Sequence, residues 1–349
     1  MSVTNIKCEY IWLDGTSPTQ SLRSKTKIVS CNLDEEKGLD LNLQDFPLWS
    51  FDGSSTNQAD TTNSDCVLAP IFACIDPNRM GGVLVLCEVL NQDMTPHKTN
   101  TRAELIKTLV AAGEQVPVVG FEQEYFLYSE GQPLGWIGGP PGPQGPYYCS
   151  VGAGNVEGRE LAESHLTACL SSGLSIEGIN AEVALGQWEY QIGGPRINAA
   201  LACDQLWISR YLLSRMTEGA NISVNWDPKP ISGDWNGSGL HTNFSTATMR
   251  GEGGYHAVLE GVSKLETATA WSDYYGDGLE KRLTGEHETC SLEEFKSGVA
   301  DRSASVRIPW HVEVSQAGYF EDRRPNSNAD PYKVVTFLVN TVCNSTPVI

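Results

Sequence analysis

The sequence pattern changes near residue 100, from strand-like segments to a helix-like segment, and this change predicts a two-domain architecture. Five short segments before it are typical of β-strands, because they are apolar or alternating, end at turn residues and lack helical periodicity. They read EYIWLDG, KTKIVSC, LWSFDGSS, VLAPIFACI and VLVLCEVL. Residues 99–114 then combine a cap candidate, helical spacing of apolar residues and a terminal Gly. We therefore predict a small β-rich domain over residues 1–98 and a second domain over residues 99–349.

The second domain mixes helices and strands. Residues 158–173 and 204–219 have apolar side chains at helical spacing, and strand-like segments separate them. The expected fold class is α+β.

Charge excludes several classes of partner. The chain has 24 Lys and Arg against 43 Asp and Glu, a net charge of −19, which repels nucleic acid and anionic membrane surfaces. The longest apolar run, Val83 to Leu90, is too short for a spanning helix. The first residues resemble neither a signal peptide nor a transit peptide, so we expect a cytoplasmic protein with reduced, buried cysteines.

Two pairs of carboxylates occur in strand-forming sequence. In residues 116–128, Glu122 and Glu124 would project from one face of a strand. Such a pair is often only a solvated polar face. The second pair is Glu182 and Glu189, and Glu189 lies between two aromatic residues in an apolar segment. A carboxylate in that setting needs a cation.

A histidine and a fifth carboxylate join these four glutamates as candidate ligands. Gly237 and Gly239 permit a tight turn before a strand on which His241, Asn243 and Ser245 share one face. Glu321 precedes Arg323 and Arg324 in YFEDRRP. Taken separately, these features are also compatible with an ordinary polar histidine and a surface salt bridge.

Together the five carboxylates and the imidazole form an oxygen-rich ligand set suited to Mg²⁺ or Mn²⁺. Six ligands are enough for two ions, and two ions beside arginines suit phosphoryl transfer. Neither a Walker motif nor a kinase signature occurs. The arginines fall in one stretch: Arg282, Arg302, Arg307, Arg323 and Arg324.

Seven long motifs along the chain resemble the eukaryotic-type (type II) glutamine synthetase family, in the order that family has them. They are FDGSST, GFEQEY, PGPQGPYYC, NAEVALGQWEYQIG, DPKPISGDWNGSGLHTNFST, DRSASVRIP and YFEDRRPNSNADPY. The resemblance implies a β-grasp-like N-terminal domain and a catalytic domain with a curved antiparallel sheet flanked by helices. It also implies an ATP-dependent ligase that joins L-glutamate to ammonia through a γ-glutamyl phosphate, giving L-glutamine.

The resemblance also assigns residues. Glu124, Glu182 and Glu189 would hold one metal ion near glutamate, and Glu122, His241 and Glu321 another near the phosphates. The glutamate site would contain Asn236, Gly237, His241, Arg282 and Arg323. The nucleotide and phosphate positions would be Ser245, Arg250, Arg302, Arg307 and Tyr319.

Two further catalytic positions follow from the same resemblance. Asp52 would attract ammonium and accept its proton, from the N-terminal domain of a neighbouring subunit, because family members assemble as rings. A homodecamer of two pentamers is the expected assembly. Glu288 would belong to a flap that closes over the acyl phosphate and keeps water out.

Three positions depart from the family pattern. Val118 replaces a usual Trp, Glu286 a usual Phe in the flap, and Trp310 a usual Arg. The loss of an aromatic ring at Val118 predicts weaker stacking on adenine. A non-catalytic relative and a ligase for a larger amine are the two alternative hypotheses.

Overall fold

The computed structural model describes residues 2–33, 41–139, 141, 146–287 and 289–343. The chain divides into two compact units, the first formed by residues 1–104 and 167–174 and the second by residues 105–166 and 175–349. Among the described residues, no helix combines the length and the apolar character that crossing a membrane requires.

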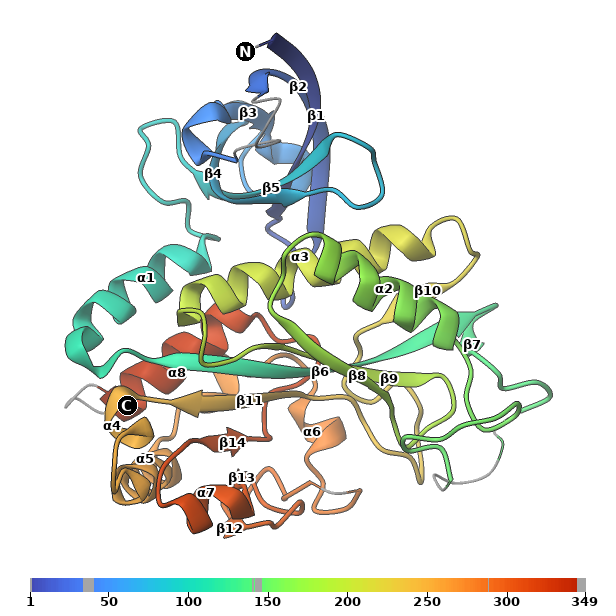
Figure 1. Cartoon of the computed structure of the whole chain (residues 1–349), viewed down its shortest axis with the longest axis vertical. Helices are drawn as coiled ribbons and strands as arrows, with labels where there is room; N and C mark the ends of the chain where they lie inside the picture. Colours follow the sequence, from blue (N-terminus) through green and yellow to red (C-terminus); the bar gives the residue numbers. More distant parts are fainter. Residues whose placement is uncertain (1, 34–40, 140, 142–145, 288, 344–349) are drawn as a thin grey trace. The chain divides into compact units, whose positions relative to one another are not determined.

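The first unit contains a five-stranded sheet in the order β2-β1-β5-β4-β3 (Figure 1). Its strands are β1 (Ser2–Leu13), β2 (Leu22–Leu33), β3 (Trp49–Asp52), β4 (Asp65–Ile75) and β5 (Gly82–Leu90). Strands β1 and β5 are parallel and the other neighbours antiparallel. Alternate residues of β1, including Cys8, Tyr10 and Trp12, enter one apolar core. The strands predicted from the sequence are confirmed.

The second unit is built on a nine-stranded sheet. Seven strands follow the order β12-β13-β14-β11-β6-β9-β8, while β7 and β10 also pair with β6. The bounds are β6 (Val118–Ser129), β7 (Gln132–Pro133), β8 (Ile176–Ala181), β9 (Gln187–Gly193), β10 (Ser223–Asn225), β11 (Leu240–Ser245), β12 (Ser297–Val299), β13 (Val306–Ile308) and β14 (Phe320–Asp322). All described pairings are antiparallel except β12 with β13, so the expected antiparallel sheet has one parallel pair.

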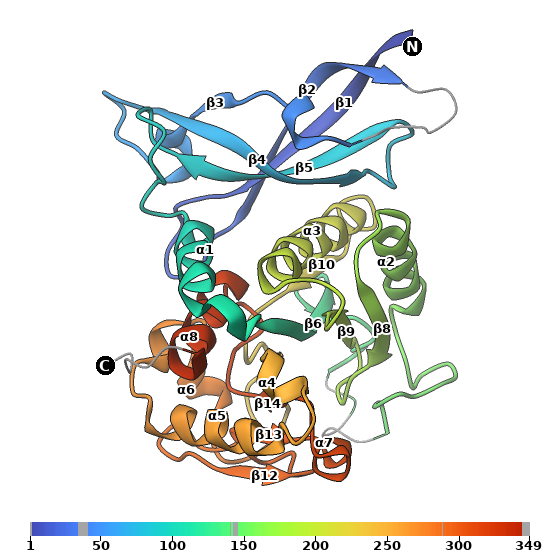
Figure 2. The ribbon, with the colours of Figure 1, turned by 60° about the vertical axis from the view of Figure 1, so that its left-hand side comes forward.

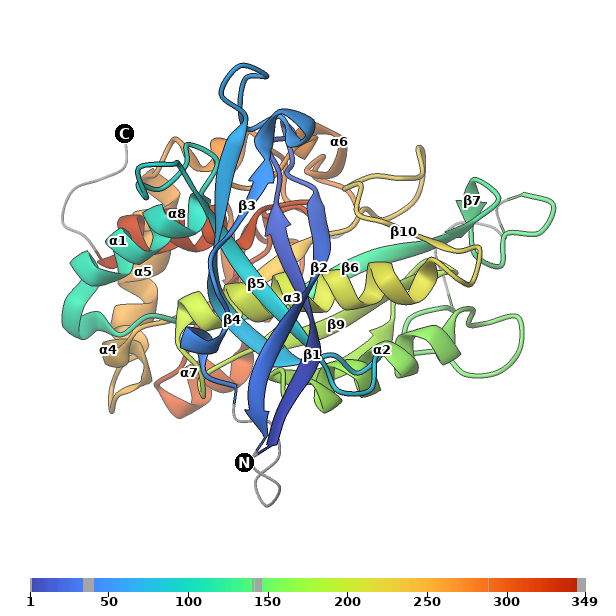
Figure 3. The ribbon, with the colours of Figure 1, turned by 90° about the horizontal axis from the view of Figure 1, so that it is seen from above.

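The described residues form eight α-helices. They are α1 (Thr101–Ala112), α2 (Arg159–Ser171), α3 (Ala199–Thr217), α4 (Ala247–Arg250), α5 (Tyr255–Thr267), α6 (Leu279–Arg282), α7 (Trp310–Ser315) and α8 (Pro331–Cys343). Helix α3 packs along β6 and β9 (Figure 3), and α5 lies beside α8 (Figure 2).

Helix α3 begins five residues earlier than the periodicity predicts. Asn198 caps it by accepting a 2.8 Å hydrogen bond from the Leu201 N–H. The helix is buried over most of its length, so it forms the central support of the sheet.

Candidate functional site

The register of four central strands brings the predicted ligands together. Glu122 on β6 pairs with His241 on β11, and Glu124 pairs with Glu189 on β9. On the other side of β11, Asn243 pairs with Glu321 of β14. Side chains at paired positions lie on the same face of a sheet. The acidic residues and His241 therefore form one polar patch across the middle of the sheet.

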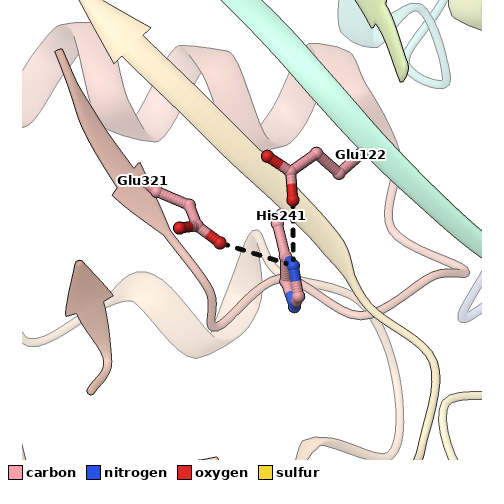
Figure 4. A group of neighbouring side chains, drawn as sticks. All are labelled: Glu122, His241 and Glu321. Carbon is pink, nitrogen blue, oxygen red and sulfur yellow. Dashed lines mark ion pairs between the residues drawn. The ribbon is translucent and has the colours of Figure 1, made fainter. Parts of the chain in front are cut away.

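The first ligand group consists of Glu122, His241 and Glu321 (Figure 4). The His241 Nδ1 atom lies 3.4 Å from a Glu122 oxygen and 3.5 Å from a Glu321 oxygen. Glu321 is almost fully buried, so the sequence alternative of a surface salt bridge is wrong. Arg307 and Arg323 donate to its two carboxylate oxygens at 2.9 and 2.5 Å.

The second ligand group consists of Glu124, Glu189 and His241. His241 thus belongs to both groups. The Gly239 N–H donates to Glu124 Oε2 at 2.6 Å, which orients that carboxylate. Burial, together with the charges of Glu122 and Glu182, raises the pKa of the Glu189 carboxyl well above its usual range.

The His241 imidazole is uncharged at neutral pH, as a metal ligand must be. Burial, and then the positive charge of Arg323, lower the pKa of the His241 imidazole to about 4. The Arg282 Nη2 group donates to His241 Nε2 at 3.2 Å. Without a metal ion, a neutral imidazole with that contact carries its proton on Nδ1, toward Glu122 and Glu321. A cation bound by this group would take the place of that proton.

Glu182 is connected to the second group through two amides. The Gln191 side chain donates to Glu189 and also, at 2.7 Å, to Asn180 Oδ1. Asn180 in turn donates to Glu182 Oε1 at 3.0 Å. Sequence reasoning missed Asn180 and Gln191 as supports of the ligands. The sequence feature that could have identified them is their position two residues from a carboxylate, Asn180 before Glu182 and Gln191 after Glu189.

Arg282 lies beside the ligands and is buried. It donates to the carbonyls of Arg323 and Arg324 at 3.0 and 3.2 Å. We expected Gly237 and Gly239 to permit a tight turn, but neither has a left-handed backbone. A Cβ atom at Gly239 would lie 2.4 Å from Arg282 Nη2, and one at Gly237 would lie 2.9 Å from its Cγ. Gly239 therefore leaves space for Arg282, and Gly237 leaves space both for Arg282 and for the Pro228 carbonyl, which would lie 2.2 Å from an added Cβ.

A cavity of about 400 Å³ lies at the start of β6, and Asn243 in its wall donates to the ligand Glu122 at 2.9 Å. Ser245, Arg250 and Tyr319 line it together with Val118. Ser245 Oγ donates to the Gly318 carbonyl at 2.6 Å, and Arg250 Nη2 to the Val116 carbonyl at 3.0 Å. The three predicted nucleotide positions thus gather around one cavity.

The structure describes most of the remaining predicted residues. Arg302 is exposed in the turn before β13, and Arg324 forms a buried bidentate pair with Asp322 at 2.9 and 2.7 Å. Asn236 is buried beside Gly237. Asp52 belongs to the first unit, is exposed, and accepts hydrogen bonds from Ser54 and Ser55. Glu288 lies outside the described residues.

The donors fit one or two hard divalent cations. Each group offers three ligand atoms within 4.8 Å of one another, from carboxylate oxygens and one imidazole. These are the ligands that Mg²⁺ and Mn²⁺ prefer. Buried carboxylates as close as this repel one another unless a cation or a proton compensates them.

Comparisons with known proteins place the chain in a family. Two family models match, "Glutamine synthetase, beta-Grasp domain" over residues 6–92 and "Glutamine synthetase, catalytic domain" over residues 99–270. A glutamine synthetase of Streptomyces viridochromogenes is 51% identical, with 97% of each chain covered. Those of Frankia alni and Tuber borchii are each 48% identical over 97% of this chain and cover 93% and 92% of their own lengths. With these family-model matches, identities and coverages, the chain belongs to the glutamine synthetase family.

Proposed function

We propose that the polar patch on β6, β9, β11 and β14 is the reaction centre of a glutamate–ammonia ligase. In this reaction the γ-carboxylate of glutamate attacks the γ-phosphorus of ATP and ADP leaves. Ammonia then displaces phosphate from the acyl carbon and gives L-glutamine. The observation that carries the assignment is the pair of ligand groups that share His241, all of whose members except the half-buried Glu122 are buried.

Mg²⁺ or Mn²⁺ ions are the proposed cofactors. Glu122, His241 and Glu321 would hold one ion, and Glu124, Glu182 and Glu189 another, with His241 within reach of both. When bound, such ions neutralise the charge on the phosphoryl oxygens. The proximity of Glu124, Glu189 and His241 supports the second assignment, and the amide bridge through Asn180 and Gln191 supports the inclusion of Glu182.

Arginines supply the remaining positive charge. We assign Arg302, Arg307 and Arg323 to the transferring phosphoryl group, because guanidinium groups match its oxygens. Arg307 and Arg323 already contact Glu321. The glutamate site would contain Asn236, Gly237, Arg282 and Arg323, on the side of His241 where Arg282 lies.

The cavity at the start of β6 is the proposed nucleotide site, with Ser245, Arg250 and Tyr319 in its wall. Asn243 in its wall supports this assignment, because it donates to Glu122 and pairs with Glu321, so the phosphates of a nucleotide there could reach the ligand groups. Glu288 is assigned to water exclusion by family resemblance alone.

Ammonium capture is assigned to Asp52. Hydrogen bonds from Ser54 and Ser55 lower the pKa of the Asp52 carboxyl, which keeps it anionic and able to attract a cation. We propose that Asp52 serves the site of a neighbouring subunit in a cytoplasmic homo-oligomeric ring, with domains at residues 1–98 and 99–349.

The direct test is release of phosphate from ATP, measured with glutamate and with or without ammonium. Release that requires all three substrates, with L-glutamine as product, supports the proposal. Turnover with a larger amine in place of ammonium would overturn the ammonia assignment. Absence of turnover with Mg²⁺ or Mn²⁺ present would favour a non-catalytic member of the family.

A further inference from the structure

A buried arginine lies directly behind the ligand-bearing strand. Arg210, on α3, is almost fully buried, and the negative charge of Asp330 acts on its guanidinium. Its guanidinium lies 4.7 Å from the ring centre of Trp207 and 5.5 Å from that of Trp226. Burying a cation is costly unless its donors are satisfied, so the hydrogen bonds of Arg210 must compensate for the solvation that it loses.

The main partner of Arg210 is Gln123, between the ligands Glu122 and Glu124. Arg210 Nε and Nη2 both donate to Gln123 Oε1, at 2.8 and 2.6 Å. Because side chains alternate along a strand, Gln123 points away from the face that carries the two glutamates. The Gln123 amide then donates to the Glu124 carbonyl at 2.9 Å and to the Ser327 carbonyl at 3.1 Å.

The second partner is the segment that follows β14. Arg210 donates to the carbonyls of Ser327 and Ala329, at 2.9 and 3.0 Å. This segment begins at Arg323, two residues after Glu321. One guanidinium thus connects α3, the strand of Glu122 and Glu124, and the segment that continues from Glu321.

The same segment also contacts the proposed glutamate site. Its carbonyls at residues 323 and 324 accept from Arg282, and the Ser327 N–H donates to the Ser238 carbonyl at 3.1 Å. A displacement of the segment would therefore move both Arg282 and the loop that contains Gly237.

We propose that Arg210, acting through Gln123, is a positioning residue that fixes the spacing between Glu122, Glu124 and Glu321. It touches neither substrate nor metal. The inference rests on the proposed function in that these glutamates are taken as metal ligands.

The test uses Arg210→Lys, which keeps the charge but loses the planar fork of donors. Arg215→Lys is the matched control, since Arg215 lies on the same helix, is exposed and pairs with Glu218. The dissociation constant of Mn²⁺ alone is measured with each folded protein through the paramagnetic resonance of free Mn²⁺. We expect Arg210→Lys to bind Mn²⁺ about 10–100-fold more weakly and the control to match the wild type.

Steady-state kinetics give a second readout. Arg210→Lys should raise the KM for glutamate more than the KM for ATP, because the proposed nucleotide cavity is lined by other residues. A variant with a lower thermal midpoint but unchanged Mn²⁺ affinity and glutamate KM would overturn the proposal, since it would show a purely structural role. If Arg210→Lys does not fold, the double variant Gln123→Met/Arg210→Met takes its place, because it removes donor and acceptor together.

The two proposals fail in different ways. Wild-type protein that binds Mn²⁺ but forms no glutamine contradicts the proposed function and leaves the Arg210 comparison intact. Wild-type protein that forms glutamine, with Mn²⁺ affinity unaffected by Arg210→Lys, contradicts only the positioning role.

Discussion

Glu124 on β6 and Glu189 on β9 occupy directly opposite positions of an antiparallel strand pair, and both carboxylates are buried. Like charges at opposite positions destabilise a sheet. Hydrogen bonds from Gly239 and Gln191 relieve this repulsion in part, and the raised pKa of the Glu189 carboxyl shows the cost of keeping both groups ionised. The metal-free fold therefore carries an electrostatic cost at the position where a divalent cation would be most stabilising.

Neutralising one member of the pair tests this relationship. Glu189→Gln should raise the thermal midpoint of the metal-free protein by about 2–4 °C, because it removes roughly 1 kcal/mol of repulsion. It should also remove most of the stabilisation that Mn²⁺ gives the wild type. Glu293→Gln, at an exposed position of the same unit, is the control. A lower midpoint without metal would show that the hydrogen bonds outweigh the repulsion.

Because His241 belongs to both ligand groups, its substitution should affect Mn²⁺ binding differently from substitution of Glu182. Activity should require Mg²⁺ or Mn²⁺, and both His241→Ala and Glu182→Ala should abolish it. His241→Ala should weaken every Mn²⁺ site, because His241 belongs to both ligand groups. Glu182→Ala should weaken one site and leave the other nearly unchanged. Titration of free Mn²⁺ separates the two patterns, and full turnover in excess chelator contradicts the metal assignment.

Completion of the site by a neighbouring subunit predicts complementation. Asp52→Ala and Arg302→Ala proteins, each inactive alone, should regain partial activity after mixing if Asp52 serves a neighbour's site. Hybrid interfaces would then contain an intact Asp52 and an intact Arg302. Subunit exchange is confirmed independently by labelled protein, and exchange without recovered activity would indicate sites built within one chain.

Part of the site follows from local sequence patterns. The alternation of Glu122 and Glu124 and the spacing from His241 to Ser245 are properties of single strands, so the sequence is enough to predict them. Which strand lies beside which depends on pairing between distant segments. The register that joins His241 to Glu122 sets the cluster, and only the family resemblance anticipated it.

Other features escaped sequence reasoning for a physical reason. Arg210 reads as one polar residue in an amphipathic helix, and nothing nearby in the sequence indicates that Gln123 is its partner. Asn180 and Gln191 gain their importance from contacts across β8 and β9. Helix α3 begins directly after its Asn198 cap, earlier than the helical spacing of its apolar residues predicted. The small alanines at its start contribute little to that spacing.

Acid should destabilise the first unit through Asp14. Burial raises the pKa of the Asp14 carboxyl, but hydrogen bonds from Ser21, Thr16 and Arg23 outweigh it and the net shift is downward from 3.8. A depressed pKa contributes stability above the unfolded-state value, and this stability is lost as pH falls.

Asp14→Asn should therefore lower the free energy of unfolding at neutral pH by about 1–3 kcal/mol. The difference from the wild type should shrink as the pH falls from about 5 to about 3. Urea unfolding across this range measures it, with the exposed Asp45→Asn as control. A difference that is constant with pH would mean that packing, and not the charge, accounts for the loss.

The last prediction concerns Val118, where relatives usually carry Trp. Val118 is the first residue of β6, is mostly buried, and lines the proposed nucleotide cavity with Gly194 and Tyr319. An indole stacked on a purine gains about 1–3 kcal/mol over an aliphatic side chain, and 1.4 kcal/mol is about tenfold in affinity. Val118→Trp should therefore lower the KM for ATP about fivefold or more.

The glutamate KM should stay nearly unchanged in Val118→Trp, because the proposed glutamate side chains lie around Arg282 and not in this cavity. Val118→Leu is the matched control, since it adds bulk without an aromatic face. ATP is titrated at saturating glutamate and ammonium with folded, metal-loaded protein. If the ATP KM of Val118→Trp is unchanged or higher, the indole does not reach the base, and either the cavity has repacked around Val118 or adenine binds elsewhere.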